Sequence, residues 1–314
     1  MKRLTLIAFL LLGCFTLFAQ KIVFMPQWTA QAQFAGYYVA KDMGFYEQEG
    51  LDVEIRHLNR ATKRNIISYI RSGEVQFVTS HLLLSMIAND GGLGMVNILQ
   101  TSHTNGLCVV SRTPISRFED LDGKKVGRWS TGYGENAIMM AEEKGLSIDW
   151  VTSNQSVNLF LAGALDATLV FSYNELISIY LAQGKVEPDH ILYFSDTDYN
   201  YPEDSLYCLD TYYRNNRDVV EKFVKASKRG WEYVAEHPDE ALQICMKFTR
   251  ENNIQTNIVH QRLMLEQIVE LSRGKDGEIS FAPTSREIFD RMAKKAIETG
   301  LIMSSPKYED IIKQ

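Results

Sequence analysis

The sequence predicts an α/β protein in which mostly parallel sheets are covered by helices on both faces. Short apolar runs, typical of buried strands, alternate with longer segments of helical periodicity. The chain opens with a strand–loop–helix–strand unit, and from residue 215 onward almost every segment is helical. At 314 residues it exceeds the roughly 100–200 residues of a single core, so two cores are expected.

The opening unit spans residues 22–55. Apolar residues 22–25 predict a strand, and Trp28 follows it in a polar loop. A helix is expected from Ala35, because apolar residues recur there at helical spacing, and Gly50 suits its end. A second, alternating strand then begins. Ligands of open α/β sheets bind at the carboxyl ends of strands, so the loop around Trp28 is a candidate binding site.

Periodicity and turn residues place the remaining elements. Strands are expected at residues 75–79, 95–100, 107–111, 125–128, 147–151, 167–171, 191–194 and 206–209. Helices are expected at residues 61–71, 82–89, 135–144, 157–162, 174–183, 217–235, 238–250, 254–271 and 285–299.

This order of elements fits two lobes joined by two crossings of the chain. Residues 20–111 and 205–314 are expected to form lobe 1, which is discontinuous, and residues 112–204 are expected to form lobe 2. The strand at 206–209 would return the chain to lobe 1, and a helical C-terminal tail would pack on that lobe.

The first residues differ from the rest of the chain. Two basic residues precede an apolar run at residues 4–12, and Ala19 stands at a suitable cleavage point. This pattern predicts a secretory signal peptide over residues 1–19, too short for a permanent membrane anchor. A second interpretation is a lipid-attachment motif, Leu-Leu-Gly-Cys, in which Cys14 carries the lipid. The apolar residues after Cys14 suit a tether poorly, so the sequence favours soluble export.

Composition and motifs argue against several functional classes. The formal charge is −6, and loss of the signal leaves 31 basic against 39 acidic residues, or −8. An acidic chain without a basic stripe does not fit a nucleic-acid-binding protein. The six histidines lack metal-ligand spacing, and no nucleophile elbow, phosphate loop or paired-carboxylate motif occurs. We therefore expect no metal, no cofactor and no enzymatic activity.

Several motifs carry a family resemblance. Trp28 is followed by A-G-Y-Y-V-A at 35–40 and by G-F-Y-x-x-x-G-L-D-V at 44–53. Later matches are S-Y-N-E at 172–175, P-E-D at 202–204, R-G-W-E-Y at 229–233 and H-P-D-E-A at 237–241. Together these segments resemble the solute-binding proteins of ABC importers that are related to yeast thiamine-pyrimidine synthase and to the aliphatic-sulfonate binders. The resemblance implies a type II periplasmic binding protein with a hinge of two crossing strands.

The same resemblance implies a function and its alternatives. An exported protein of this family would bind a small heteroaromatic ligand, a thiamine pyrimidine precursor or a flavin-like molecule, and deliver it to an ABC permease in the inner membrane. We expect a monomer. The alternatives are a synthase-like enzyme that holds pyridoxal phosphate on a lysine, and an extracytoplasmic ligand sensor. In the synthase branch a His precedes the T-G pair, and here Phe34 stands in its place.

Three segments supply the candidate ligand contacts, each with a simpler structural interpretation beside it. The loop after the first strand would form one wall, although a Trp in such a loop also caps cores. The loop 128–135 would expose N–H groups for an anion or carbonyl, or be a plain strand-to-helix turn. The motifs at 172–175 and 202–204 would add polar contacts, or serve as a helix N-cap and a solvated acidic loop. The predicted contacts are Trp28, Gln31, Phe34, Tyr37, Ser80, Trp129, Tyr133, Gly134, Tyr173, Glu175 and Glu203.

Cys108 and Cys208 lie on the predicted strands that leave lobe 1 and return to it. In the type II topology the two crossings are neighbours, so these thiols are candidates for a disulfide in an oxidising compartment. Two buried free thiols are the other interpretation, because spacing alone does not supply disulfide geometry.

The predicted export can be tested on protein isolated from its native host. Cleavage of the signal should leave Gln20 as the first residue in N-terminal sequencing, with a matching intact mass. A diacylglycerol mass on Cys14 would show lipid anchoring and contradict soluble export.

Overall fold

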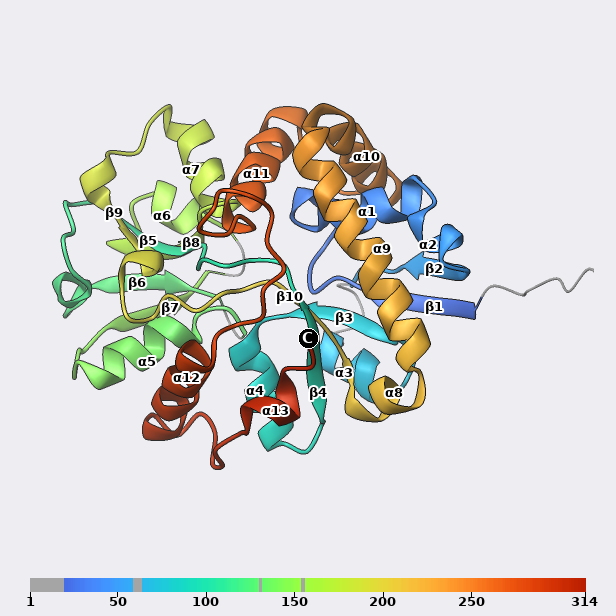
Figure 1. The fold of residues 1–314 in the computed structure, drawn as a ribbon. Helices are drawn as coiled ribbons and strands as arrows, with labels where there is room; N and C mark the ends of the chain where they lie inside the picture. Colours follow the sequence, from blue (N-terminus) through green and yellow to red (C-terminus); the bar gives the residue numbers. More distant parts are fainter. Residues whose placement is uncertain (1–19, 59–63, 130–131, 154–155) are drawn as a thin grey trace, which may run out of the picture.

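The computed structural model describes residues 20–58, 64–129, 132–153 and 156–314. The predicted signal peptide, residues 1–19, and Cys14 lie outside the described residues. The described chain forms two five-stranded sheets, each with helices around it, and the two units lie side by side in Figure 1. The predicted fold class, α/β with two lobes, is confirmed.

The first sheet has the strand order β2-β1-β3-β10-β4. Its strands are β1 (Gln20–Met25), β2 (Leu51–Ile55), β3 (Phe77–Ser80), β4 (Met95–Gln100) and β10 (Ser205–Leu209). β1 is parallel to β2 and β3, whereas β10 is antiparallel to its neighbours β3 and β4. The strand predicted to return the chain to lobe 1 therefore does so as an inserted antiparallel strand.

Alternation along β1 explains why helices cover both faces of this sheet. Ile22 and Phe24 face one core, and Val23 and Met25 face another. The first face is covered by α1 (Ala35–Asp42), α2 (Phe45–Gln48), α9 (Arg217–Glu236) and α10 (Pro238–Glu251). Near the other face lie α3 (Ile66–Arg71) and α4 (Leu82–Asp90). α8 (Asp210–Asn215) packs on the first face, where Tyr212 meets Phe77, and α13 (Tyr308–Ile311) lies against β4.

The helix expected between Ala35 and Gly50 is two helices. α1 ends at Asp42 and α2 begins at Phe45, because Gly44 adopts a left-handed conformation with φ of 72°. Gly50, with φ of 77°, ends the second helix at the predicted place.

The second sheet has the order β7-β6-β8-β5-β9. Its strands are β5 (Leu107–Ser111), β6 (Lys125–Arg128), β7 (Asp149–Thr152), β8 (Ala167–Phe171) and β9 (Ile191–Tyr193). Its helices are α5 (Glu135–Glu143), α6 (Asn158–Leu161) and α7 (Glu175–Gln183). In Figure 1, α5 lies on one side of this sheet, and α6 and α7 lie on the other.

One strand lies in a different lobe from the one expected. We expected residues 107–111 at the end of lobe 1, but β5 pairs with β8 and β9 in the second sheet. The apolar run that predicted the strand fits the interior of either sheet, so the pairing partner had to come from the fold. The chain therefore crosses between the lobes before Leu107, not after residue 111.

The two crossings run side by side and are hydrogen-bonded to each other. Thr101 N donates to Asp204 O at 3.1 Å, and Glu203 N donates to Ser102 Oγ at 2.9 Å. Asn105 N donates to the side chain of Asn200 at 2.9 Å. These bonds place the acidic pair of the P-E-D motif inside the hinge.

We expected the helical tail to pack on the first lobe, but it contacts both lobes. α11 (Ile258–Leu271) contacts α7 of the second lobe as well as the 3-10 turn η1 (Ala32–Phe34) of the first. α12 (Arg286–Glu298) packs on α4, and its Lys295 forms an ion pair with Glu143 of α5. Among the residues described, no helix combines the length and apolar character needed to cross a membrane.

Cys108, Cys208 and Cys245 are buried free thiols. Cys108 lies in the second sheet and Cys208 in the first, so the considered disulfide between them is not formed. Burial raises the pKa of the Cys208 thiol to about 12, which makes it a poor nucleophile for disulfide exchange.

The packing of α1 on α9 depends on two glycines. A Cβ on Gly230 would lie 2.0 Å from the Gly36 carbonyl oxygen, a backbone atom that cannot rotate away. Gly230→Ala should therefore lower the free energy of unfolding by roughly 3 kcal/mol, or prevent folding. Urea denaturation followed by circular dichroism measures the change.

Gly91→Ala is the matched control, because Gly91 is exposed, has φ of −80°, and a Cβ there comes no closer than 3.4 Å to another atom. It should change the free energy of unfolding by less than about 0.5 kcal/mol. Equal stabilities of the two variants would show that α1 and α9 do not approach as closely as described.

Candidate ligand-binding site

A small cavity of about 20 Å³ lies between the lobes, where β1, β6 and β8 end. Half of its lining is aromatic and the rest consists of amides and one carboxyl group. The lining residues are Gln27, Trp28, Gln31, Gln33, Trp129, Tyr133, Phe171, Tyr173, Asn174 and Glu175. A concave site with an apolar wall and a few placed polar groups is typical of small-molecule binding.

The aromatic side chains surround the cavity from both lobes. Trp28, from the first lobe, meets Tyr133 of the second edge-on, with ring centroids 5.3 Å apart. Phe171 at the end of β8 stacks on Tyr173 at 5.1 Å and tilts against Trp129 at 5.0 Å. A flat ligand would therefore meet ring faces and edges on more than one side.

A buried carboxylate orients the amides of the first lobe. Asp204 accepts hydrogen bonds from Gln27 Nε2 at 2.6 Å and from Gln33 Nε2 at 2.7 Å. Gln31 Nε2 in turn donates to Gln33 Oε1 at 2.6 Å. Burial raises the pKa of Asp204 to about 6, although both amide bonds favour its charged form.

Glu175, the first residue of α7, supplies the carboxyl group of the cavity wall. One of its oxygens accepts from Phe171 N and the other from Asn174 Nδ2, both at 3.0 Å. Burial raises its pKa from the ordinary 4.5 to about 7. The side chain is thus held in place by its neighbours while it titrates near neutral pH.

Two hydrogen bonds join the lobes across the site. Tyr133 donates its hydroxyl proton to the Gln27 carbonyl oxygen at 3.3 Å. Gln33 Nε2 lies 3.2 Å from the Tyr173 hydroxyl oxygen, to which it donates. The structure therefore shows the two lobes in contact at this point.

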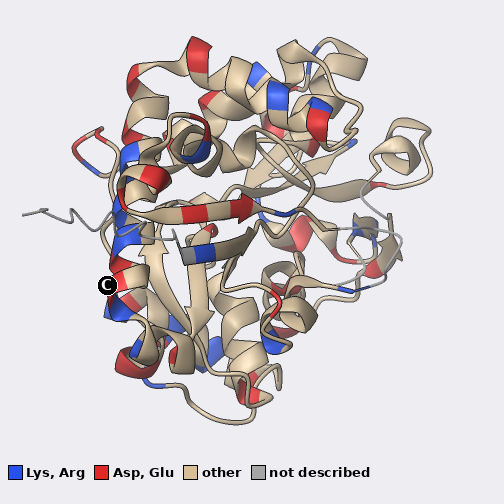
Figure 2. Ribbon diagram, turned by 90° about the vertical axis from the view of Figure 1, so that its right-hand side faces the viewer, with Lys and Arg blue, Asp and Glu red and all other residues tan. Residues whose placement is uncertain are grey.

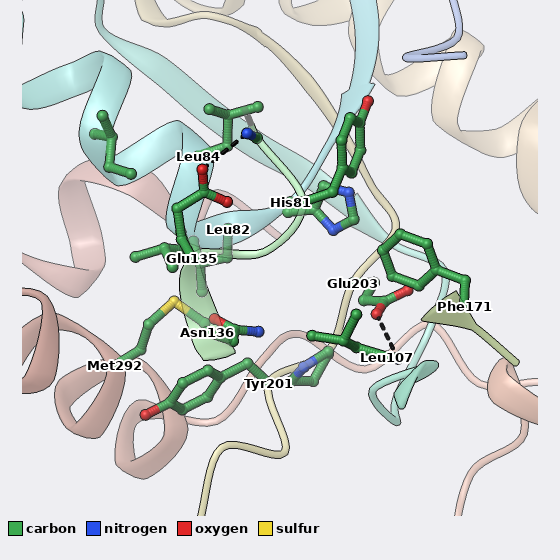
Figure 3. A pocket seen from close by; sticks show the side chains of 15 residues that line it. His81, Leu82, Leu84, Leu107, Glu135, Asn136, Phe171, Tyr201, Glu203 and Met292 are labelled. Carbon is green, nitrogen blue, oxygen red and sulfur yellow. Dashed lines mark hydrogen bonds between the residues drawn. The ribbon is translucent and has the colours of Figure 1, made fainter. Parts of the chain in front are cut away.

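A second cavity of about 30 Å³ lies on the far side of Tyr133 and Phe171 (Figure 3). Most of its lining is apolar: α4 contributes Leu82, Leu83, Leu84 and Ile87, and Leu107, Tyr201 and Met292 come from other elements. His81 faces it and packs against Tyr133 and Phe171, with ring centroids 5.3 and 6.2 Å away. Burial lowers the pKa of His81 to about 4, so this imidazole is neutral at pH 7.

Six of the predicted contacts line the first cavity: Trp28, Gln31, Trp129, Tyr133, Tyr173 and Glu175. Two others do not reach it. Phe34 contacts Tyr38 and His57, and Tyr37 packs against Phe24 and Trp231. Both face the core of the first lobe, because the helical phase of η1 and α1 turns them away from the cleft.

The remaining three predicted residues have structural partners. Ser80 is fully buried at the end of β3 and lines neither cavity. Glu203 lines the second cavity and accepts hydrogen bonds from Gly106 N and Leu107 N, both at 3.1 Å, so it holds the hinge. Burial and the neighbouring Asp204 raise its pKa well above the usual range.

The Gly134 loop does not offer the free N–H groups that we expected. Glu135 turns back on it, and its carboxylate accepts from Gly132 N at 2.8 Å and from Gly134 N at 3.0 Å. The position of Glu135 directly after the loop could have indicated that its carboxylate would accept these N–H groups in place of a ligand.

The predicted contacts omit five residues of the site: Gln27, Gln33, Phe171, Asn174 and Asp204. Phe171 was assigned to a strand end and Asn174 to a helix cap, and Glu203 was chosen in place of Asp204. The position of Gln27 beside Trp28, and of Asp204 in the P-E-D motif, was the available signal. Their roles depend on a contact 177 positions apart in the chain, which local patterns do not contain.

The raised pKa of Glu175 predicts a pH-dependent stability. Between pH 4.5 and 7 the folded protein holds a proton that the unfolded chain has lost, so stability falls as the pH rises. Glu175→Gln should remove much of this fall and make the ligand-free protein more stable at pH 8, by on the order of 2–3 kcal/mol. Urea titrations at pH 5 and pH 8 measure it.

Glu266→Gln, at an exposed position of α11, is the control and should leave the pH dependence unchanged. A Glu175→Gln variant that is as stable as the parent at both pH values would mean that Glu175 ionises freely.

Comparisons with known proteins show the family to which this chain belongs. A family model described as NMT1/THI5 like matches residues 31–241, which is more than half of the chain. A formylaminopyrimidine-binding protein of Halalkalibacterium halodurans is 26% identical over 239 residues, covering 73% of this chain and 71% of that protein.

Other curated relatives have different functions. The 4-amino-5-hydroxymethyl-2-methylpyrimidine phosphate synthase of Candida albicans is 25% identical over 240 residues, 70% of this chain and 69% of the synthase. The riboflavin-binding protein RibY of Chloroflexus aurantiacus is 21% identical over 259 residues, 79% of this chain and 72% of RibY. The family thus contains both binding proteins and synthases.

A solved structure agrees with the fold. The periplasmic aliphatic sulphonate binding protein SsuA from Escherichia coli superimposes with a TM-score of 0.68 at 13% identity, covering 94% of this chain and 92% of SsuA. The fold is therefore that of the periplasmic binding proteins, and the chain belongs to the NMT1/THI5-like family.

Proposed function

We propose that this protein is the solute-binding component of an ABC importer. It is exported to the periplasm, binds a small heteroaromatic ligand between its lobes, and delivers it to a permease in the inner membrane. The observation that supports this most directly is the interlobe cavity, in which aromatic side chains of both lobes meet a set of oriented amides. Named relatives that bind a formylaminopyrimidine and riboflavin support the ligand class.

Binding accounts for the cavity better than the synthase chemistry of the yeast relatives. A Schiff base with pyridoxal phosphate needs a lysine, and the described residues that line the two interlobe cavities include none. What the lining does provide is ring faces, amides and a carboxyl group held by neighbours, which suit recognition without bond cleavage.

We expect a ligand to favour closure of the lobes, because both lobes contribute aromatic contacts to the cavity. Trp28 belongs to the first lobe and Tyr173 to the second, so a ring held between them favours the state in which both lobes meet it. Stacking of this kind contributes on the order of 1 kcal/mol beyond buried area. The paired crossings allow hinge motion while their mutual hydrogen bonds keep the lobes in register.

The space left between the lobes is too small for a ring in this closed arrangement, about 20 Å³ against the roughly 300–1,000 Å³ of small-molecule pockets. A ligand would therefore enter as the lobes part. A flavin-like tricycle would in addition need Tyr133 to swing aside, so that the first cavity joins the second cavity behind it.

Trp28→Ala tests the site. We expect one compound of a panel of pyrimidines, flavins, nucleobases and sulfonates to stabilise the parent protein by about 2.7 kcal/mol at 100 times its dissociation constant. The variant should lose that thermal shift, since it lacks one wall, yet remain folded. Differential scanning fluorimetry with circular dichroism measures both.

Tyr180→Ala is the control, because Tyr180 is an exposed aromatic on α7 outside the cavity. It should keep the full shift. A strong shift from an aliphatic sulfonate alone, unaffected by Trp28→Ala, would contradict the proposed site.

A further inference from the structure

The charged side chains that line the two interlobe cavities are all acidic, and beside them the guanidinium of Arg128 donates to the Trp129 carbonyl oxygen. Glu175 lines the first cavity, Asp204 lies directly behind its amides, and Glu203 lines the second cavity (Figure 3). None of the described residues lining either cavity is a lysine or an arginine. The same holds for the described part of the amide-rich groove that adjoins Trp28 and Glu175. Elsewhere, Figure 2 shows basic and acidic residues mixed along the helices.

The cavity wall contains a buried hydrogen-bond acceptor without a partner among the described residues. One N–H of Gln31 and one of Asn174 donate to neighbours within the site, and Gln33 Nε2 donates to both Asp204 and Tyr173. Gln27 is only 2% exposed, and its Nε2 is committed to Asp204. Its Oε1, by contrast, is buried without a hydrogen-bond partner among the described residues. A buried acceptor of this kind is costly unless a ligand donates to it.

The aromatic walls favour the same kind of ligand. The faces of indole, phenol and phenyl rings carry negative electrostatic potential and attract cations within about 6 Å. Five of the ten lining residues are aromatic, and they come from both lobes. A neutral ring would also stack here, but a cation is in addition attracted electrostatically to the ring faces and to the carboxylates.

From the one-signed lining, the unpaired Gln27 Oε1 and the ring faces together, we infer that the ligand is a planar organic cation that donates hydrogen bonds, such as a protonated aminoheterocycle or an amidinium. This inference rests on the proposed binding function and narrows its ligand class. An anionic ligand, such as a sulfonate, would face buried carboxyl groups with no described counter-charge in the cavity.

Proton release should accompany binding. Burial holds the pKa of Glu175 near 7 and that of Asp204 near 6, and a cation beside them lowers both. The titratable groups facing Asp204 are Glu203 and three buried tyrosines, 37, 133 and 173. Near Glu175, His260 contacts Asn174 O at 3.2 Å, and burial lowers its pKa. Affinity for a cation should therefore rise between pH 5 and pH 8.

Three probes of one shape test the inference: benzamidine as the cation, benzamide as the neutral form and benzoate as the anion. We expect benzamidine to bind at least tenfold more tightly than benzamide in calorimetry, and benzoate not to bind. At pH 6.5, buffers of different ionisation enthalpy should reveal protons released with benzamidine. Glu175→Gln should weaken benzamidine at least tenfold and change benzamide little, while Glu266→Gln changes neither.

Other outcomes reject the inference. Preference for benzamide or benzoate overturns it, as does the absence of benzamidine binding at millimolar concentration. Benzamidine binding that Trp28→Ala leaves unchanged also rejects it, because the cation would then lie outside the cavity. In each case a thermal shift from a neutral pyrimidine or from riboflavin, abolished by Trp28→Ala, would leave the proposed function standing.

Discussion

The carboxylate of Asp204 is the group on which the geometry of the site depends. It lies on the return crossing, immediately before β10 enters the first sheet between β3 and β4. Its side chain fixes the amides of Gln27 and Gln33, and its carbonyl oxygen accepts from Thr101 of the other crossing. A buried carboxylate needs such partners. One residue thus couples the hinge to the orientation of the ligand-facing loop.

The contacts that join the lobes across the candidate site are individually weak, whereas the Lys295–Glu143 ion pair and the packing of α11 on α7 join the lobes elsewhere. Tyr133 and Gln33 each make one uncharged hydrogen bond across the site, and the Trp28–Tyr133 contact is an edge-on aromatic pair. Each of these contributes only on the order of 1 kcal/mol. A ligand with a modest preference for the closed arrangement can therefore shift the balance between open and closed states.

Local sequence patterns predicted where the helices and strands lie, but not which strands and side chains contact one another. β4, β5, β6 and β8 have the expected bounds. β4, β5 and β8 are mostly apolar runs between turn residues, whereas β6, Lys-Val-Gly-Arg, follows the turn at Gly123. Local patterns did not predict which sheet β5 joins, because that depends on its pairing with β8. They also did not predict that the Glu135 carboxylate accepts the hydrogen bond from Gly134 N. The same limit applies to the site. Trp28 and Tyr173 could be predicted as contacts because each follows the end of a strand, whereas the role of Asp204 depends on residues far away in the sequence.

Glu175 and Asp204 lower the stability of the ligand-free protein, since burial opposes their ionisation at neutral pH. A core built only for stability would replace such groups with apolar side chains of similar volume. Their retention in the wall of an interlobe cavity is the expected result when binding requires buried charge, because function commonly opposes stability at such positions. The stability lost in the free state is recovered when a complementary ligand lies beside these groups. Affinity, closure and protonation are then coupled through the same two side chains.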